Sequence, residues 1–213
     1  VLPAVKQKER HETDLKLRYD FNYCTFSYTM AFWDWNRWQK EIDWMALHGI
    51  NMPLQIVGLD VVWQKLLTQD LGYTDDEANA FIAGPCFQAW WGMNNLQGWG
   101  GKNPAWWYKR QEALAKKILA RERELGMEPV LPGYAGMVPS DIAKKGYSAN
   151  NQGNWCGFLR PYILDPNTEA FAEISAKYYA RLAEVMGTSA YYSMDPFHEG
   201  ANTSGIDVAS AYK

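Results

Sequence analysis

Residues 169–195, EAFAEISAKYYARLAEVMGTSAYYSMD, decide the fold because a helix, a glycine and a strand follow one another there. We interpret the first part of the run as a helix that ends at Gly187, and AYYSMD as a strand. Asp165 and Pro166, just before the run, predict the start of the helix, since an N-cap acid and a proline at the first helical position are typical there.

The same order of helix, glycine and strand occurs near the start of the chain. A helix is expected from about Asp34, because apolar side chains at positions 35, 38, 42 and 45 recur at spacings of three and four. Gly49 suits the left-handed position at the end of that helix. The nearly continuous apolar run INMPLQIVG at 50–58 is then expected to be a strand buried on both faces.

A third repeat occupies the middle of the chain. A long helix is expected over about 106–125, followed by Gly126 and by the strand MEPVLPGYAG at 127–136. Between the second and third strands, DVVWQKLLTQDLG at 60–72 predicts a helix, and TDDE at 74–77 is a capping box that opens a further short one.

The segment before the first helix completes the pattern. FNYCTFSYTM at 21–30 is rich in aromatic and β-branched residues, which predicts the first strand. Residues 1–18 are polar and charged, and we interpret them as a connecting arm.

Alternation of strands and helices indicates an α/β fold with a parallel sheet. The long loops, rich in aromatic residues and glycine, follow strands, and a (β/α)8 TIM-type barrel builds its active site from such loops. The rival doubly wound sheet lacks its usual GxGxxG or GxxxxGK[ST] signature here. Four expected strands, together with the helices and loops between them, already use about 200 of the 213 residues, and a barrel needs eight strands. We therefore expect residues 19–213 to be the first half of a barrel, about four βα units.

Bulk composition excludes several classes of protein. The net charge is −3, so a general attraction for nucleic acid is not expected. No run of 18 apolar residues is present, so no membrane span is expected. The three cysteines show no CxxC spacing, which leaves a zinc ribbon or a redox motif unsupported.

Aromatic residues make up 15% of the chain, with 11 Trp and 13 Tyr. Many lie in segments rich in Gly and Asn, such as QAWWGMNNLQGWGG at 88–101, which are not typical of core helices. Aromatic faces in loops stack well on a flat apolar ligand face such as a sugar ring.

The hexapeptide DPFHEG at 195–200 follows the fourth expected strand. Glu199 would lie at the mouth of a barrel, where a carboxyl group can protonate a leaving oxygen. The alternative is an ordinary solvated loop carboxylate. His198 could position Glu199 or hydrogen-bond a substrate. A metal site is not expected, because the other histidines lie elsewhere and no HExxH motif is present.

Several long blocks resemble the α-N-acetylglucosaminidases of glycoside hydrolase family 89. They are CTFSYTMAFWDWNRWQKEIDWMALHGIN, AGPCFQAWWGMNNLQGW, EPVLPGYAGMVP and DPFHEG, in that order over about residues 18–200. The resemblance implies a (β/α)8 catalytic domain that releases terminal α-linked N-acetylglucosamine with retention of configuration. It also implies that Glu199 is the acid/base and that the nucleophile is a second glutamate beyond this chain.

The same resemblance implies sugar contacts at Asn22, Cys24, Tyr28, Trp90, Met93 and Trp155, beside His198. Each residue type also has a simpler explanation. Cys24 and Met93 could fill the core. The two tryptophans could anchor loops, Asn22 could cap a strand end, and Tyr28 could pack within the barrel. Alternation along the expected first strand would place residues 22, 24 and 28 on one side.

Two other functions remain open from the residues. One is a sugar-binding module without catalysis, and the other is a barrel glycosidase of different anomeric specificity. The expected partners are a glycan with terminal α-linked N-acetylglucosamine and the remainder of the same catalytic domain. A two-carboxylate mechanism needs no metal or organic cofactor. Enzymes of the family usually meet glycans outside the cytosol, so an extracytosolic location is expected.

Overall fold

The computed structural model describes residue 4 and residues 6–211. Its centre is a set of four short parallel strands. β1 (Tyr19–Asp20) pairs with β2 (Met52–Pro53), and β3 (Val130–Pro132) pairs with β8 (Tyr191–Ser193). A parallel bridge between Leu54 and Val130 joins the two pairs. The spatial order β1-β2-β3-β8 therefore follows the order along the chain, as the repeated helix–glycine–strand pattern predicts.

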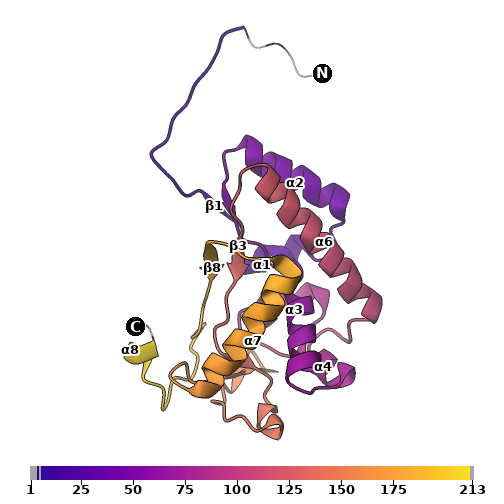
Figure 1. Ribbon diagram of the computed structural model, residues 1–213, viewed down its shortest axis with the longest axis vertical. Helices are drawn as coiled ribbons and strands as arrows, with labels where there is room; N and C mark the ends of the chain where they lie inside the picture. Colours follow the sequence, from indigo (N-terminus) through magenta and orange to yellow (C-terminus); the bar gives the residue numbers. More distant parts are fainter. Residues whose placement is uncertain (1–3, 5, 212–213) are drawn as a thin grey trace.

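Four main helices follow these strands or connect them: α2 (Trp35–Leu47), α3 (Leu59–Lys65), α6 (Ala105–Glu124) and α7 (Glu169–Met186). α6 packs against both α2 and α7, and α3 packs against α7 (Figure 1). The expected α/β architecture is confirmed, because parallel strands that are joined by long crossovers need helices to cover them.

Two clusters of buried side chains hold these layers together. One lies under α2 and includes Trp38, Ile42 and Met45, none of which is exposed. The other lies under α3 and α7 and includes Trp63 and Tyr178. Full burial of a large apolar side chain typically contributes about 1.5–3 kcal/mol, so these clusters supply most of the driving force for the fold.

Several local signals in the sequence are confirmed. Asp34 caps α2, and its carboxylate accepts a hydrogen bond from the backbone N–H of Arg37 at 3.0 Å. Thr74 and Glu77 form the capping box that opens α4 (Asp75–Phe81). Gly187 ends α7. Each of these signals depends only on neighbours in the chain, which is why the sequence suffices.

The prediction that α7 begins at Asp165 is wrong by three residues. The N-cap is Thr168, whose hydroxyl accepts from the backbone N–H of Phe171 at 3.3 Å. Asp165 instead accepts from the N–H of Asn167 at 2.9 Å within the preceding turn. Asp and Thr are both good capping residues, and here the acid stabilises the turn while the hydroxyl opens the helix.

The prediction of a first strand over 21–30 is also wrong. The strand ends at Asp20, because Phe21 has a φ of 71° and cannot continue an extended chain. Asn22 then caps α1 (Tyr23–Thr25), and the chain continues as the π-helical segment η1 (Phe26–Met30). Alternation along a strand therefore does not relate residues 22, 24 and 28.

The remaining elements lie in the connections. α3 continues as the π-helical η2 (Leu66–Asp70), η3 is Pro85–Phe87, α5 is Gln88–Gly92, η4 is Ile142–Lys145 and α8 is Val208–Ala211. Two antiparallel pairs lie between β3 and α7: β4 (Met137–Val138) with β7 (Tyr162–Ile163), and β5 (Asn154–Trp155) with β6 (Phe158–Leu159). The sequence did not predict these two pairs.

The N-terminal segment leaves the body of the protein. Residues 6–18 form no helix or strand, and Figure 1 shows them extending away from the helices. The chain reaches the body at Arg18, whose N–H donates to the side chain of Asn51 at 2.8 Å. Residues 1–3 and 5 of the predicted arm lie outside the described residues.

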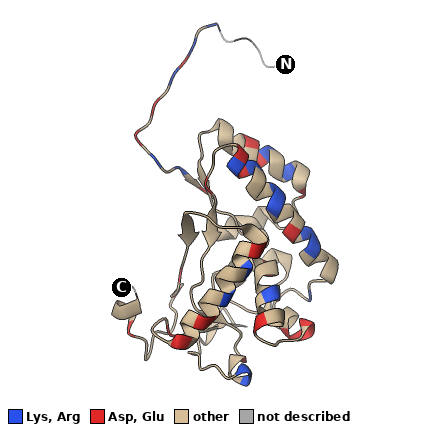
Figure 2. Cartoon of the chain, in the orientation of Figure 1, with Lys and Arg blue, Asp and Glu red and all other residues tan. Residues whose placement is uncertain are grey.

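Charged side chains lie mostly on the helices and along the N-terminal segment, with both signs interspersed on α6 and α7 (Figure 2). In the part of the chain that the structure describes, no helix is long and apolar enough to span a bilayer.

Candidate active site

Glu199 lies six residues beyond the end of β8, in a turn whose backbone is hydrogen-bonded by the side chain of Arg160. Its φ of 44° is in the left-handed region, which is uncommon for any residue but glycine. The guanidinium of Arg160, a side chain only 3% exposed, donates to the carbonyl oxygen of Glu199 at 2.7 Å and to that of His198 at 3.2 Å. These two bonds stabilise the strained turn and so fix where the Glu199 side chain begins.

The carboxylate of Glu199 is held by two donors from two other loops. Asn95 Nδ2 lies 2.8 Å from Oε2, and Trp155 Nε1 lies 2.6 Å from the same oxygen. Hydrogen bonds to a charged acceptor are about twice as strong as neutral ones. The carboxylate is therefore held in place by the fold on one side, and its outer side is exposed.

His198 stands between two carboxylates. Its Nδ1 pairs with Asp195, and its Nε2 lies 3.7 Å from Oε1 of Glu199. A carboxylate on one ring nitrogen fixes the orientation of an imidazole and its tautomer. The ring therefore presents Nε2 toward the side of Glu199 that Asn95 and Trp155 leave open.

Trp155 reaches Glu199 from a tight hairpin. β5 and β6 are joined by Cys156 and Gly157, whose φ values are 49° and 85°. Two central residues with positive φ are the mark of a type I′ turn, which matches the twist of paired strands. Trp155 and Phe158 are directly opposite each other across this turn, so the hairpin sets the direction of the Trp155 indole.

The loop that carries Asn95 packs against this hairpin. The N–H of Gln97 donates to the carbonyl oxygen of Leu159 at 3.0 Å, and the rings of Trp99 and Phe158 meet edge to face with centroids 4.9 Å apart. Residues 84–103 and 150–160 therefore form one aromatic platform beside Glu199, a feature that sequence spacing alone does not reveal.

Two glycines allow the loop at 84–103 to close on itself. A Cβ added to Gly98 would lie 2.0 Å from the carbonyl oxygen of Ala80, and one added to Gly84 would lie 2.5 Å from that of Gly100. No side chain fits at such distances, so close approach of backbone to backbone requires glycine at both positions.

A buried carboxylate anchors the start of the same loop. Asp60 is fully buried and accepts from Trp107 Nε1 at 2.8 Å and from Gln88 Nε2 at 3.0 Å. Burial raises the pKa of Asp60, and the bonds from Gln88 and Trp107 partly offset that effect. Since Gln88 opens α5, Asp60 ties this short helix to the body of the protein.

α5 presents Trp90, and η1 presents Tyr28 against it. Their rings meet edge to face with centroids 5.2 Å apart, and Tyr28 is 76% exposed. The carbonyl oxygen of Trp90 accepts from the N–H of Asn95 at 2.8 Å. Since Asn95 also bonds the Glu199 carboxylate, this bond links the two rings to Glu199. Met93 ends α5 and is partly buried.

Asn22 and Cys24 are placed differently from the sequence-based expectation. Asn22 is a helix cap, and its Oδ1 accepts from the N–H of Thr25 at 3.0 Å. Cys24 is a partly buried residue of α1. Within the described residues, no hydrogen bond or ring contact joins either of them to Glu199. α1 does pack against α5, and a cavity of about 30 Å³ is lined by Tyr23, Asn94 and Asp195, among others.

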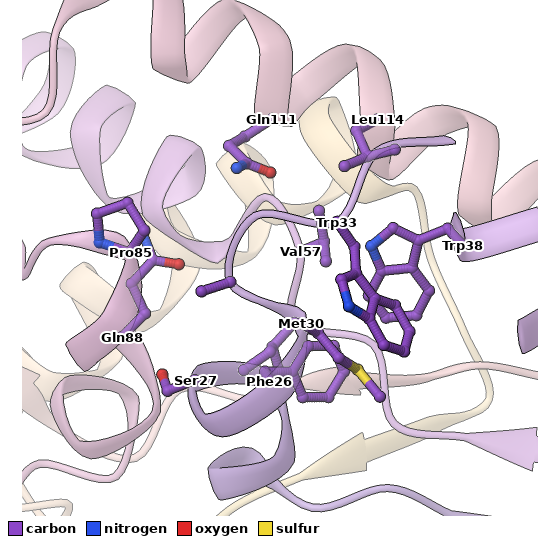
Figure 3. Close-up of a pocket in the computed structure, with 12 residues that line it drawn as sticks. Phe26, Ser27, Met30, Trp33, Trp38, Val57, Pro85, Gln88, Gln111 and Leu114 are labelled. Atoms are coloured by element: carbon purple, nitrogen blue, oxygen red, sulfur yellow. The ribbon is translucent and has the colours of Figure 1, made fainter. Parts of the chain in front are cut away.

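A second cavity of about 30 Å³ lies between η1, α5 and α6 and is separate from Glu199 (Figure 3). Phe26, Met30 and Trp38 line it on one side, and Gln88 and Gln111 on the other. Next to it, the Ser27 hydroxyl accepts from the N–H of Ala89 at 3.0 Å. The cavity therefore lies at the contact between η1 and α5.

The site contains two residues that the sequence analysis missed, Asn95 and Arg160. Asn95 lies in the aromatic segment 88–101, which the sequence marks as unusual, but nothing in the sequence indicates that its partner is Glu199. Arg160 carries no such signal, because only the fold brings the end of β6 beneath Glu199. Among the described residues, no group of three or more His, Cys, Asp or Glu side chains could hold a metal ion.

The chain is similar to known proteins in both sequence and structure. Residues 18–213 match the model of the alpha-N-acetylglucosaminidase (NAGLU) tim-barrel domain. The human alpha-N-acetylglucosaminidase is 38% identical over 204 residues, which cover 93% of this chain and 27% of the human protein.

Solved structures of a family 89 glycoside hydrolase from Clostridium perfringens superpose closely. The complex with 2-acetamido-1,2-dideoxynojirimycin gives a TM-score of 0.91 at 39% identity and covers 94% of this chain. The complex with GlcNAc-alpha-1,4-galactose, described as the substrate of that enzyme, gives 0.90 at 39% identity. The present chain covers 23% of the chain in each of these structures, so it spans about a quarter of its relatives. The match to the family model over residues 18–213 shows that the chain belongs to the α-N-acetylglucosaminidase family, glycoside hydrolase family 89.

Proposed function

We propose that the protein to which this chain belongs hydrolyses terminal α-linked N-acetylglucosamine with retention of configuration, and that Glu199 is its acid/base. The observation that carries the proposal is the Glu199 carboxylate, which follows the last parallel strand and accepts hydrogen bonds from Asn95 and Trp155. The carboxyl ends of barrel strands are where catalytic residues of such enzymes lie.

The chemistry follows from two carboxyl groups about 5–5.5 Å apart, as in retaining glycosidases. Protonated Glu199 gives its proton to the glycosidic oxygen while the second carboxylate attacks the anomeric carbon. Glu199, now ionised, then removes a proton from the water that releases the sugar. The second carboxylate is a glutamate in the part of the catalytic domain that follows this chain. The two carboxyl groups supply this chemistry without a metal or an organic cofactor.

The sugar would lie against the aromatic platform. Tyr28, Trp90 and Met93 would meet the apolar face of the ring, with Trp155 and His198 beside the scissile bond. Asn22 and Cys24 would contact the sugar from α1. The bound ligands of the Clostridium perfringens relative, among them GlcNAc-alpha-1,4-galactose, favour an N-acetylglucosaminide as the substrate.

We also propose that residues 19–213 form the first four βα units of a (β/α)8 barrel, with residues 1–18 as a connecting arm. The order β1-β2-β3-β8 supports this, because successive parallel strands are neighbours in a barrel. The two outer strands would pair with strands from the remainder of the same domain.

The decisive experiment is Glu199→Gln in the full-length protein. Turnover of substrates with poor leaving groups should fall by about 10²–10⁴-fold, the usual contribution of general acid catalysis. The first step with an activated aryl α-N-acetylglucosaminide should suffer less, because its leaving group needs less protonation. Equal and small losses on both substrates would remove Glu199 from this role, and cleavage of the β-linked aryl substrate in place of the α-linked one would overturn the anomeric assignment.

A further inference from the structure

We propose that Asn95 is a positioning residue that makes Oε1 of Glu199 the oxygen that carries the transferable proton. The proposal rests on the function proposed above and assigns a role to a residue that the sequence analysis did not single out. It concerns which of two chemically equal oxygens faces the substrate.

The two oxygens of Glu199 have different surroundings. Oε2 accepts from Asn95 Nδ2 at 2.8 Å and from Trp155 Nε1 at 2.6 Å. An indole N–H can only donate, and so can the NH₂ group of an amide. A proton on Oε2 would face two donor hydrogens, so a proton that Glu199 acquires is directed to Oε1.

Oε1 has room for a substrate atom. Among the described residues it takes part in no hydrogen bond, and its polar neighbour is His198 Nε2 at 3.7 Å. The pairing of His198 Nδ1 with Asp195 holds the ring there. Arg160, the remaining charged group beside Glu199, binds backbone carbonyl oxygens and not the carboxylate. The proton on Oε1 therefore points into the open side of the site.

Asn95 is a costly residue for a purely structural role. It is fully buried, and its Oδ1 has no hydrogen-bond partner. An unpaired buried carbonyl oxygen is unfavourable, so an apolar side chain of the same size would serve packing better. The hydrogen bond from Asn95 Nδ2 to Glu199 explains why this position holds an amide side chain and not an apolar one. The preceding residue, Asn94, has a φ of 66°, which turns the chain and brings residue 95 under the carboxylate.

The test compares Asn95→Leu with a matched control, Asn103→Leu, in the full-length enzyme. Asn103 is buried in the same loop, donates to the carbonyl oxygen of Ala83 at 3.1 Å and also bonds the hydroxyl of Tyr108, away from Glu199. For Asn95→Leu, kcat on a disaccharide with a poor leaving group should fall about 10- to 100-fold, the range for a lost hydrogen bond to a charged group. KM and the rate with an activated aryl substrate should change much less.

The pH profile supplies a second readout. Hydrogen bonds to a carboxylate favour its ionised form. Loss of the Asn95 donor should therefore move the alkaline limb of kcat/KM to higher pH than in the wild type. Asn103→Leu should lower the melting temperature and leave both the profile and the dependence on leaving group unchanged.

Trp155→Phe keeps the ring and removes the other donor to Oε2, so it should shift the alkaline limb in the same direction. It carries the test if Asn95→Leu does not fold. Wild-type leaving-group dependence and an unmoved alkaline limb in whichever of these variants folds would overturn the proposal. Full activity of Glu199→Gln would instead overturn the proposed function itself.

Discussion

Arg160 binds the backbone of Glu199 and not its carboxylate: the guanidinium donates to the carbonyl oxygens of residues 198 and 199 at 3.2 and 2.7 Å. Burial lowers the pKa of Arg160, and the negative charge of Glu199 partly opposes that shift. A buried cation at this place stabilises a turn with positive φ at Glu199. The direction of the Glu199 side chain is therefore set in part by a residue whose guanidinium does not bind the carboxylate.

The first prediction follows from this relationship. In Arg160→Lys, one ammonium group cannot reproduce the planar fork that reaches both carbonyl oxygens. Displacement of a reacting group by about 1 Å can cost about 100-fold, so kcat should fall by about 10- to 100-fold while most of the protein stays folded. Arg110→Lys, at an exposed position, is the control and should leave kcat unchanged. Wild-type kcat in Arg160→Lys would contradict the assigned role.

A second prediction concerns Cys24, which α1 holds partly buried. If it lies close to the bound sugar, Cys24→Phe should raise KM by about one to two powers of ten, since overpacking a tight site costs about 1–3 kcal/mol. Melting temperature and KM should be measured together, with Cys86→Phe at an exposed position as the control. A large fall in melting temperature with unchanged KM would make Cys24 an ordinary core residue.

The third prediction concerns pH and stability. Glu122 on α6 is fully buried, with the side chain of Gln55 as its polar neighbour. Burial raises the pKa of Glu122 to about 8, more than the neighbouring Gln55 and Arg123 lower it. An unfolded glutamate ionises near its usual value, about 4.3. Between these values the folded state holds a proton that the unfolded state has lost, so stability falls as pH rises.

The contribution of Glu122 should be complete below about pH 4 and be lost progressively up to about pH 8, on the order of a few kcal/mol in total. Melting temperatures of the full-length protein at pH 5, 6.5 and 8 would measure it. Glu122→Gln should remove this part of the pH dependence, whereas Glu124→Gln, at an exposed position, should not. An identical pH dependence in wild type and Glu122→Gln would show that Glu122 does not titrate as its burial implies.

The fourth prediction is that the 213-residue chain alone has no glycosidase activity. The proposed nucleophile lies beyond it, and the outer edge of a sheet exposes unpaired backbone groups that favour association. Supplying the remainder of the catalytic domain as a separate chain should restore some turnover. Robust turnover by the purified 213-residue chain would show that either the half-barrel or the two-carboxylate mechanism is wrong.

The sequence predicted best what neighbours in the chain determine. Gly187 ends α7 and Thr74 opens α4 because capping involves only a few adjacent residues. The strand prediction for 21–30 is wrong because aromatic and β-branched residues also fit a helical segment with one buried face: Phe26 and Met30 are buried, whereas Tyr28 is exposed. Only the positive φ of Phe21 and the Asn22 cap end the strand early.

The site was predictable in part for the same reason. Glu199, His198 and the aromatic segments are visible as local motifs. Asn95 and Arg160 act across sequence separations of 104 and 39 residues, and no local pattern specifies which side chains will meet over such distances. Trp155 was expected at the sugar, and the structure adds a bond to Glu199 that only the packing of the two loops creates.

The glycine contacts of the loop at 84–103 decide which positions of this protein could be redesigned. Libraries that randomise Gly84 or Gly98 would consist mostly of variants in which the loop cannot close, since any Cβ would lie within 2.5 Å of a backbone oxygen. Tyr28, whose side chain is largely exposed above Trp90, can change without such a clash. A directed-evolution experiment aimed at sugar recognition should therefore keep both glycines constant and place its diversity at Tyr28.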